Sequence, residues 1–386
     1  MVSSSSNKIN KNDIFEYLLS ESIENVINSF HANPDKILTE NLRKSLFFNH
    51  VSNSLKLYRS NHDCIYLNCT KKSIKNSHTI SKKLFLATIE ENGHVLRPKF
   101  DTNTNSFILD KIGINLASTF PGFCTNHEKL FQDFEEKDQF NTPEHFNLQL
   151  YRTICREYFI KKYQQRIYSQ LLISYKEFRN NALLEKYRKD NFIKFLESKG
   201  LQFKGLKYSM PDTFEKLITK ELNYLNKEID IMHVYYQKGT DLLEGKDDFW
   251  GKAYSLDIQI PVCLSGRANF KVNDNGKEKN IIVFINVLPQ KINTTINICG
   301  LNKDEDYIKL YLNSALTDGI SFLTMIETWM VRGTDHWFIK PSIWQKISRK
   351  SQKTILQDFR DLSYNIGTPY LITIFQDLKA MLTMSN

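Results

Sequence analysis

The stretches Cys64-Ile-Tyr-Leu-Asn-Cys69 and Cys124-Thr-Asn-His127 decide how the first half of this chain of 386 residues is expected to fold. Each stretch brings two soft ligands close together: two thiols in the first, and a thiol and an imidazole in the second. Zinc prefers thiolate and imidazole ligands at the four corners of a tetrahedron. The spacing therefore predicts one structural zinc ion (Zn²⁺) bound by Cys64, Cys69, Cys124 and His127.

This pattern leaves two alternatives open. Because Cys69 and Cys124 lie far apart in the chain, the four residues also fit unrelated buried cysteines and a histidine at the start of a helix. His62, two residues before Cys64, is an alternative zinc ligand. A closed site with four ligands would contribute on the order of 10 kcal/mol to folding, which would explain how so irregular a stretch holds together.

The composition is that of a basic, globular protein. Hydrophobic residues make up 41% of the chain and charged residues 25%, which allows packed cores and excludes wholesale disorder. The formal net charge is +9. Such an excess favours a polyanionic partner, with nucleic acid (DNA or RNA) ahead of a membrane surface.

The cysteines and the apolar runs bear on the compartment. Six cysteines in a chain of this length do not form the framework of a small disulfide-rich protein, which indicates a reducing compartment. The first residues contain no apolar segment typical of a signal peptide, and no run of about 18 apolar residues occurs. We therefore expect a cytoplasmic protein without a membrane partner.

Periodicity predicts an α+β protein in four parts. In residues 1–60, apolar residues recur at helical spacing from Asp13 and again from Thr39, which predicts two N-terminal helices. Residues 61–140 form the zinc module, with a helix capped by Ser81 and then a loose hairpin.

A long helical hairpin is expected over residues 141–240. Thr142 and Pro143 are typical of a helix start, because a hydroxyl caps the helix and proline fits its first turn. A second helix begins after Pro211 and is expected to end at Gly239.

The hydrophobic period changes to two in residues 241–386, which predicts an antiparallel sheet. Asn273-Asp-Asn275-Gly276 is typical of a tight hairpin turn. Asp335-His336 is interpreted as a surface turn. This C-terminal domain is expected to offer a surface for a protein partner or a homo-oligomer. Its flanking helices are expected over 304–316, 320–331, 341–362 and 370–382.

Basic side chains recur along the helical hairpin, and we expect an exposed basic face that contacts nucleic acid. The alternative is a solvated face, in which arginines pair with a neighbouring glutamate, Glu157. The residues expected to contact nucleic acid are Arg152, Arg156, Lys161, Lys162 and Arg166; Lys186, Arg188 and Lys189 continue the face.

A histidine lies between the two ligand pairs, in Ser77-His78-Thr79-Ile80. Together with a loop containing Asn115 and a Cys-x2-His pair that opens a helix, this arrangement over residues 61–135 resembles the HNH nucleases of the treble-clef, or ββα-metal, class. The resemblance implies that His78 is the general base that activates water against a phosphodiester. It implies that the cysteines and His127 surround a structural zinc, and that a catalytic Mg²⁺ or Mn²⁺ stabilises the scissile phosphate. It also implies an endonuclease of a bacterial antiviral-defence or toxin system.

One position departs from the family pattern. The family often has aspartate or histidine directly before the catalytic histidine, as a ligand of the catalytic metal, and this chain has Ser77. A hydroxyl is a poorer Mg²⁺ ligand than a carboxylate. Glu128, Glu90 and Glu91 are the nearby carboxylates in the sequence. The alternative function is therefore a non-catalytic, zinc-stabilised adaptor that binds nucleic acid or protein. A third interpretation has the C-terminal domain sense a small ligand.

Overall fold

The computed structural model describes 58, 60, 62–101, 104, 106–136, 139–189, 198–200, 213–246, 248–360 and 365–384. The helices expected from Asp13 and Thr39 lie outside these residues except at Tyr58. The side chains of Lys186, Arg188 and Lys189 also lie outside them. The chain forms two compact units: residues 1–58 with 162–228, and residues 59–161 with 229–386.

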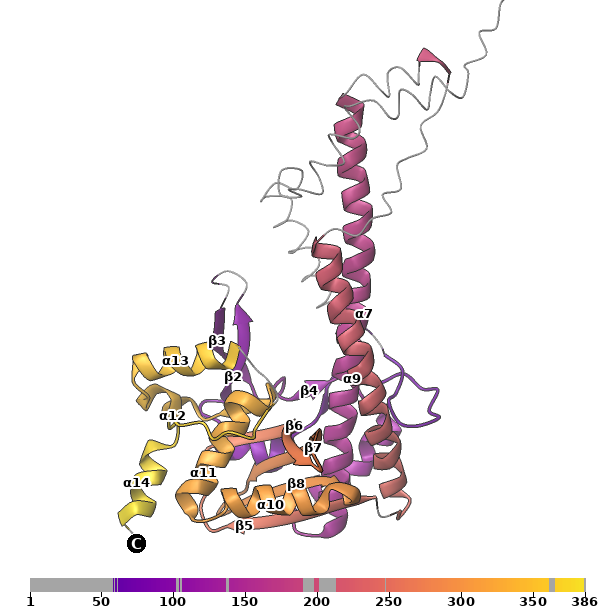
Figure 1. Cartoon of the computed structure of the whole chain (residues 1–386). Helices are drawn as coiled ribbons and strands as arrows, with labels where there is room; N and C mark the ends of the chain where they lie inside the picture. The colour runs from indigo at the N-terminus through magenta and orange to yellow at the C-terminus, as the bar shows by residue number, and fades with distance from the viewer. Residues whose placement is uncertain are drawn as a thin grey trace, which may run out of the picture. The chain divides into compact units, whose positions relative to one another are not determined.

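The second unit contains a seven-stranded antiparallel sheet with the order β3-β2-β9-β6-β7-β8-β5 (Figure 1). A separate two-stranded ladder joins β1 to β4. Helices flank the large sheet, so the expected α+β class is confirmed. The strands are β1 (Ser77–His78), β2 (His94–Asp101), β3 (Ser106–Gly113), β4 (Thr119–Phe120), β5 (Phe249–Leu256), β6 (Val262–Asp274), β7 (Lys277–Pro289), β8 (Thr294–Leu301) and β9 (Trp337–Ile339).

The helical elements alternate with these strands. Ser81 caps the first of them, as expected, because its hydroxyl accepts a hydrogen bond from the amide of Leu84. The helical elements are η2 (Lys82–Leu86), α4 (Ala87–Ile89), α5 (Thr125–Glu128), η3 (Lys129–Phe131), α6 (Gln132–Glu136), α7 (Pro143–Lys189), α9 (Thr213–Leu243), η4 (Asn302–Asp304), α10 (Glu305–Ala315), α11 (Gly319–Thr328), η5 (Trp329–Gly333), α12 (Pro341–Lys346), α13 (Arg349–Arg360) and α14 (Gln376–Met384).

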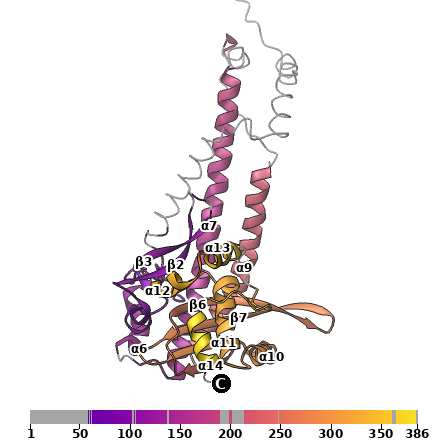
Figure 2. The same ribbon diagram turned by 90° about the vertical axis from the view of Figure 1, so that its left-hand side faces the viewer.

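The hairpin predicted at Asn275-Gly276 is confirmed. Asp274 pairs with Lys277, and both intervening residues have positive φ angles, 52° at Asn275 and 81° at Gly276. A two-residue turn with positive φ at both positions matches the right-handed twist of the strands that it joins. Figure 2 shows β6 and β7 running side by side to this turn.

The short strand β9 was not expected from the sequence, and it joins two parts that the sequence separates. Leu96 of β2 and Val262 of β6 both pair with Ile339 of β9. The hairpin formed by β2 and β3 therefore belongs to the same sheet as the C-terminal strands. The sheet runs across the expected boundary at residue 140.

The two faces of the central strands differ in polarity. Val283, Ile285 and Val287 of β7 belong to a large apolar cluster with α10, α11 and η5. On the opposite face, Asn286 accepts hydrogen bonds from Gln149 and Thr153 of α7. Because both faces are covered, β7 reads in the sequence as a nearly continuous apolar run.

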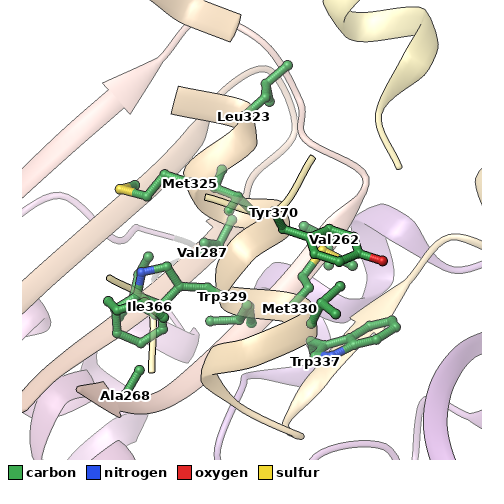
Figure 3. Packing of buried hydrophobic residues seen from close by; sticks show 14 of the residues in the cluster. Val262, Ala268, Val287, Leu323, Met325, Trp329, Met330, Trp337, Ile366 and Tyr370 are labelled. Carbon is green, nitrogen blue, oxygen red and sulfur yellow. The ribbon is translucent and has the colours of Figure 1, made fainter. Parts of the chain in front are cut away.

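The apolar cluster is anchored by large side chains from the turn that follows α11. Trp329 and Met330 lie among side chains of the sheet and of the C-terminal segment (Figure 3), and both are fully buried. Glu327, in the preceding turn, is also fully buried, and its carboxylate accepts hydrogen bonds from the amides of Ile374 and Phe375. The carboxylate thereby fixes the segment before α14.

Several helices differ from their expected bounds. The helix expected over 370–382 begins only at Gln376, as α14. Gly239 does not end a helix but lies inside α9, where an added Cβ would come within 3.3 Å of Ile154 of α7, so the missing side chain permits close packing of the two helices. The single helix expected over 341–362 is instead two helices, α12 and α13, interrupted at Ile347 and Ser348.

Candidate metal centre

Three thiols and one imidazole lie close together in the second unit. They belong to Cys64, Cys69, Cys124 and His127. Their ligand atoms all lie within 4.8 Å of one another. The sulfurs of Cys69 and Cys124 are 3.9 Å apart, and the Nδ1 atom of His127 lies 3.4 Å from the sulfurs of both Cys64 and Cys124. With ordinary zinc bond lengths, a tetrahedron has edges of about 3.8 Å between sulfurs and about 3.6 Å between sulfur and nitrogen. The predicted meeting of the four side chains is confirmed, and their spacing fits zinc.

The local fold explains how the first ligand pair is held. Between the two cysteines the backbone turns back on itself, because the amide of Cys69 bonds to the carbonyl of Tyr66 and Asn68 adopts a positive φ of 59°. The amide of Ile65 bonds to the carbonyl of Gly122, which ties this turn to the second pair. We call residues 64–69 the knuckle.

The second pair lies at the start of a helix. Cys124 precedes the first turn of α5, and His127 follows within that turn, as expected. The amide of Cys124 donates a hydrogen bond to the sulfur of Cys64 at 3.2 Å. Cys124 therefore contributes both its backbone amide and its side-chain thiol to the cluster. Tyr66 stacks on His127 with ring centres 3.9 Å apart, which fixes the imidazole plane. Contacts between a ligand and its neighbouring side chains orient that ligand toward the metal.

Electrostatics distinguish the thiols. Burial raises the pKa of the Cys64 thiol to about 12. Burial also opposes ionisation of Cys124, but hydrogen bonds from the amides of His127 and Asn126, together with those of the Cys64 and Cys69 thiols, lower the pKa of that thiol. Burial and then the charge of Lys71 lower the pKa of His127, which favours the neutral imidazole that binds metal. A bound zinc ion would stabilise the thiolates that burial disfavours.

The alternative ligand His62 lies outside the cluster. Its ring packs edge-on against Phe159, with ring centres 5.0 Å apart. Within the described part of the chain, the four predicted residues form the sole group of three or more His, Cys, Asp or Glu side chains close enough to share a metal ion.

His78 occupies the ladder of β1 with β4, where it pairs with Thr119. Burial, followed by the charge of Arg152, lowers the pKa of His78 to about 4, although Glu135 and the backbone of Ile114 oppose the shift. The Nε2 atom is buried and has no hydrogen-bond partner among the described residues. At neutral pH the imidazole is therefore uncharged.

Arg152 neutralises the carboxylates on this side of the module. Its guanidinium donates to Glu128 and to Glu135, each at 2.7 Å, and lies over the ring of Phe131 at 4.1 Å. The other nearby carboxylates in the sequence are engaged elsewhere: Glu90 accepts from the amide of Gly93, and Glu91 from the amide of Ser342. These carboxylates and Ser77, whose hydroxyl accepts from the amide of Phe123, do not form a second metal-binding group.

The expectation of an exposed basic face is wrong at three of its five positions. Arg152, Arg156 and Lys161 are buried, because this stretch of α7 packs inside the second unit. Arg156 pairs with Glu157 at 2.6 Å, in agreement with the alternative interpretation. Lys162 and Arg166 are exposed on the part of α7 that belongs to the first unit.

The surface turn interpreted at Asp335-His336 holds only for Asp335, which is exposed in a bend, whereas His336 is buried. The Nδ1 atom of His336 bonds to the carbonyl of Ser265, and its Nε2 atom bonds to the hydroxyl of Ser118 at 3.0 Å. Ser118 also accepts from the amide of Ile80, two residues after His78. This long-range contact ties the loop before β4 to the sheet, and nothing in the local sequence indicates it.

Comparisons with known proteins do not assign the chain to a class. No family model, curated protein or solved structure matches it. None of the helices in the described segments is long and apolar enough to span a membrane. The functional interpretation therefore depends on the metal centre and its surroundings.

Proposed function

We propose that this protein is a zinc-stabilised, HNH-like nuclease that hydrolyses phosphodiester bonds in nucleic acid, with His78 as the general base. The observation that carries the proposal is the state of the His78 imidazole. It lies in the ladder that leads into the zinc-binding helix, it is neutral at pH 7, and its buried Nε2 atom has no hydrogen-bond partner within the described structure. A neutral imidazole is the form that accepts a proton from water.

The residues of the chain have separate roles in this proposal. Cys64, Cys69, Cys124 and His127 would hold the structural zinc, which supplies folding energy to the knuckle and to the start of α5. The ladder of β1 with β4, in which His78 pairs with Thr119, positions His78 in the fold. The ring then takes a proton from the attacking water at Nε2.

A second, catalytic ion does not find a ready site in the described residues. Ser77 uses its hydroxyl for the amide of Phe123, and Arg152 engages one oxygen of Glu128 and one of Glu135. Mg²⁺ and Mn²⁺ bind mainly through carboxylates and water. No step is therefore assigned to a second ion, and the test below includes both metals and a chelator.

The test is a cleavage assay on plasmid DNA, single-stranded DNA and RNA, with Mg²⁺, Mn²⁺ or EDTA. We expect cleavage by the wild type and a loss of about 10²- to 10⁴-fold in His78→Ala, the usual contribution of a general base. His94→Ala is the matched control, because His94 hydrogen-bonds locally to the carbonyl of Asn92. Cleavage by His78→Ala at the wild-type rate would show that His78 is not the base.

One observation favours the alternative, a non-catalytic zinc-stabilised adaptor that binds nucleic acid or protein. The Nε2 atom of His78 is shielded from solvent as well as unpartnered, so a water molecule reaches it only after the surrounding side chains move. The adaptor predicts that the wild type binds nucleic acid or protein and cleaves no substrate under any metal condition. That outcome would replace the nuclease proposal.

A further inference from the structure

An exposed lysine lies beside the loop that holds His78. Lys82 begins η2, four residues after His78, and its side chain is exposed to solvent. Its ammonium donates a hydrogen bond to the Oδ1 atom of Asn115 at 3.1 Å. A long lysine side chain on a surface ordinarily samples many rotamers. Here the hydrogen bond restrains the ammonium over one loop.

The same loop leads into the strand that pairs with His78. Asn115 lies four residues before Thr119, the partner of His78 in the β1–β4 ladder. The charge of Lys82 also contributes, after burial and Arg152, to the low pKa of His78. The hydrogen bond to Asn115 and the pairing of His78 with Thr119 therefore place Lys82 and His78 along the same loop.

The two cations near His78 differ in how their charge is balanced. Arg152 is buried and faces two carboxylates, Glu128 and Glu135. Lys82 has a neutral amide as its partner and forms no ion pair with a described residue. The positive charge of Arg152 is therefore compensated within the fold, whereas the charge of Lys82 is exposed and available to an anion.

We propose that Lys82, positioned by Asn115, binds a phosphate group of the nucleic-acid backbone next to His78. This inference rests on the proposed function, since it names the residue that holds the substrate against the base. Lysine binds phosphate as a point charge. The contact is expected to be independent of base sequence and dependent on salt, because phosphate contacts release counterions.

The test measures binding of a fluorescent DNA duplex and a single-stranded oligonucleotide by anisotropy, without added Mg²⁺ or Mn²⁺, over a range of salt concentrations. We expect Lys82→Ala to weaken binding several-fold and to reduce the slope of log K against log salt by about one for the duplex. Asn115→Ala is expected to weaken binding less, because the charge remains. Lys83→Ala is the matched control, an exposed lysine in the same turn. Zinc content and melting temperature establish that each variant is folded.

A second measurement follows the imidazole itself. Without the ammonium of Lys82, the pKa of His78 is expected to rise toward its ordinary value in an NMR titration, whereas Lys83→Ala leaves it unchanged.

The outcomes separate this inference from the nuclease proposal. Binding that depends on Lys82 in a wild type that cleaves nothing would reject the nuclease and support the phosphate site. Equal binding and equal salt slopes in Lys82→Ala and Lys83→Ala would overturn the phosphate site, whether or not the wild type cleaves.

Discussion

The zinc cluster and the surroundings of His78 lie in the same unit. The polar atoms of the cluster have partners, whereas several polar atoms around His78 have none. The four ligand atoms of the cluster lie within 4.8 Å of one another, and backbone amides donate hydrogen bonds to its sulfurs. Around His78, buried polar atoms without a hydrogen-bond partner among the described residues include Nε2 of His78, Oγ1 of Thr79, Oε2 of Glu128 and Nε of Arg152.

This difference indicates that the zinc cluster is structural and that the surroundings of His78 are not. An unsatisfied buried polar atom costs about 1–3 kcal/mol, so a fold selected for stability alone would not retain several together. The zinc cluster gains from being closed and complete. The surroundings of His78 gain nothing in stability from their unsatisfied atoms, which is the pattern expected where a ligand or substrate supplies the missing partners.

The largest expected effect is the loss of the zinc cluster. Cys124→Ser removes a thiol whose pKa is lowered by two backbone amides and by the neighbouring Cys64. A structural zinc ion contributes roughly 10–16 kcal/mol to folding. We expect less than one zinc per chain by elemental analysis, and an unfolded or insoluble protein. Cys299→Ser is the control: its thiol donates to Asn297 at 3.0 Å, a bond that a hydroxyl can keep. A wild type that is folded and contains no metal would show that the cluster is not a structural zinc site.

The next effect concerns the buried guanidinium. Arg152→Met leaves Glu128 and Glu135 without their cation, and removing one partner of a buried ion pair costs about 3–5 kcal/mol. Urea unfolding should show this loss with the zinc content unchanged. Arg166→Met, an exposed site on the same helix, should unfold nearly as the wild type does. Similar losses in both variants would mean that Arg152 does not organise the surroundings of His78.

The third effect is the contribution of His78 to the pH dependence of the free energy of unfolding. The unfolded chain binds a proton on histidine near pH 6.5, whereas the folded protein binds it on His78 only near pH 4. The stability is therefore complete above pH 6.5 and is lost as the pH falls toward 4, by about 3 kcal/mol for a shift of this size. His78→Gln should remove this part of the pH dependence. Parallel curves for wild type and variant would place His78 in a solvated environment.

The smallest effect is expected at the ion pair beside the knuckle. Lys72 and Asp63 lie 2.7 Å apart, but both side chains are mostly exposed, so water screens the attraction. Asp63→Asn should leave the melting temperature and the zinc content unchanged. A clear drop in either would show that surface charge, and not the metal alone, holds the knuckle in place.

Local features of the sequence predicted much of the fold. The hydroxyl at Ser81, the proline at Pro143 and the Asn275-Gly276 turn each act within a few residues, and the structure confirms all three. The convergence of Cys64, Cys69, Cys124 and His127 could be predicted because their chemistry is specific, although they lie in two distant stretches. By contrast, the sequence did not predict which basic residues of α7 are buried. The helix belongs to one unit up to Lys161 and to the other from Lys162, and nothing in its sequence marks that boundary.

The sequence by itself determined the ligand set, the helix caps, the hairpin turn and the alternation of the strands, since each depends on the chemistry of neighbouring residues or on the preference of one metal. Only the tertiary structure decided that β9 joins the two sheet segments and that His336 is buried against Ser118. It also decided that Arg152 faces carboxylates while Lys82 faces solvent. These outcomes depend on contacts between residues far apart in the chain, which neither periodicity nor spacing encodes.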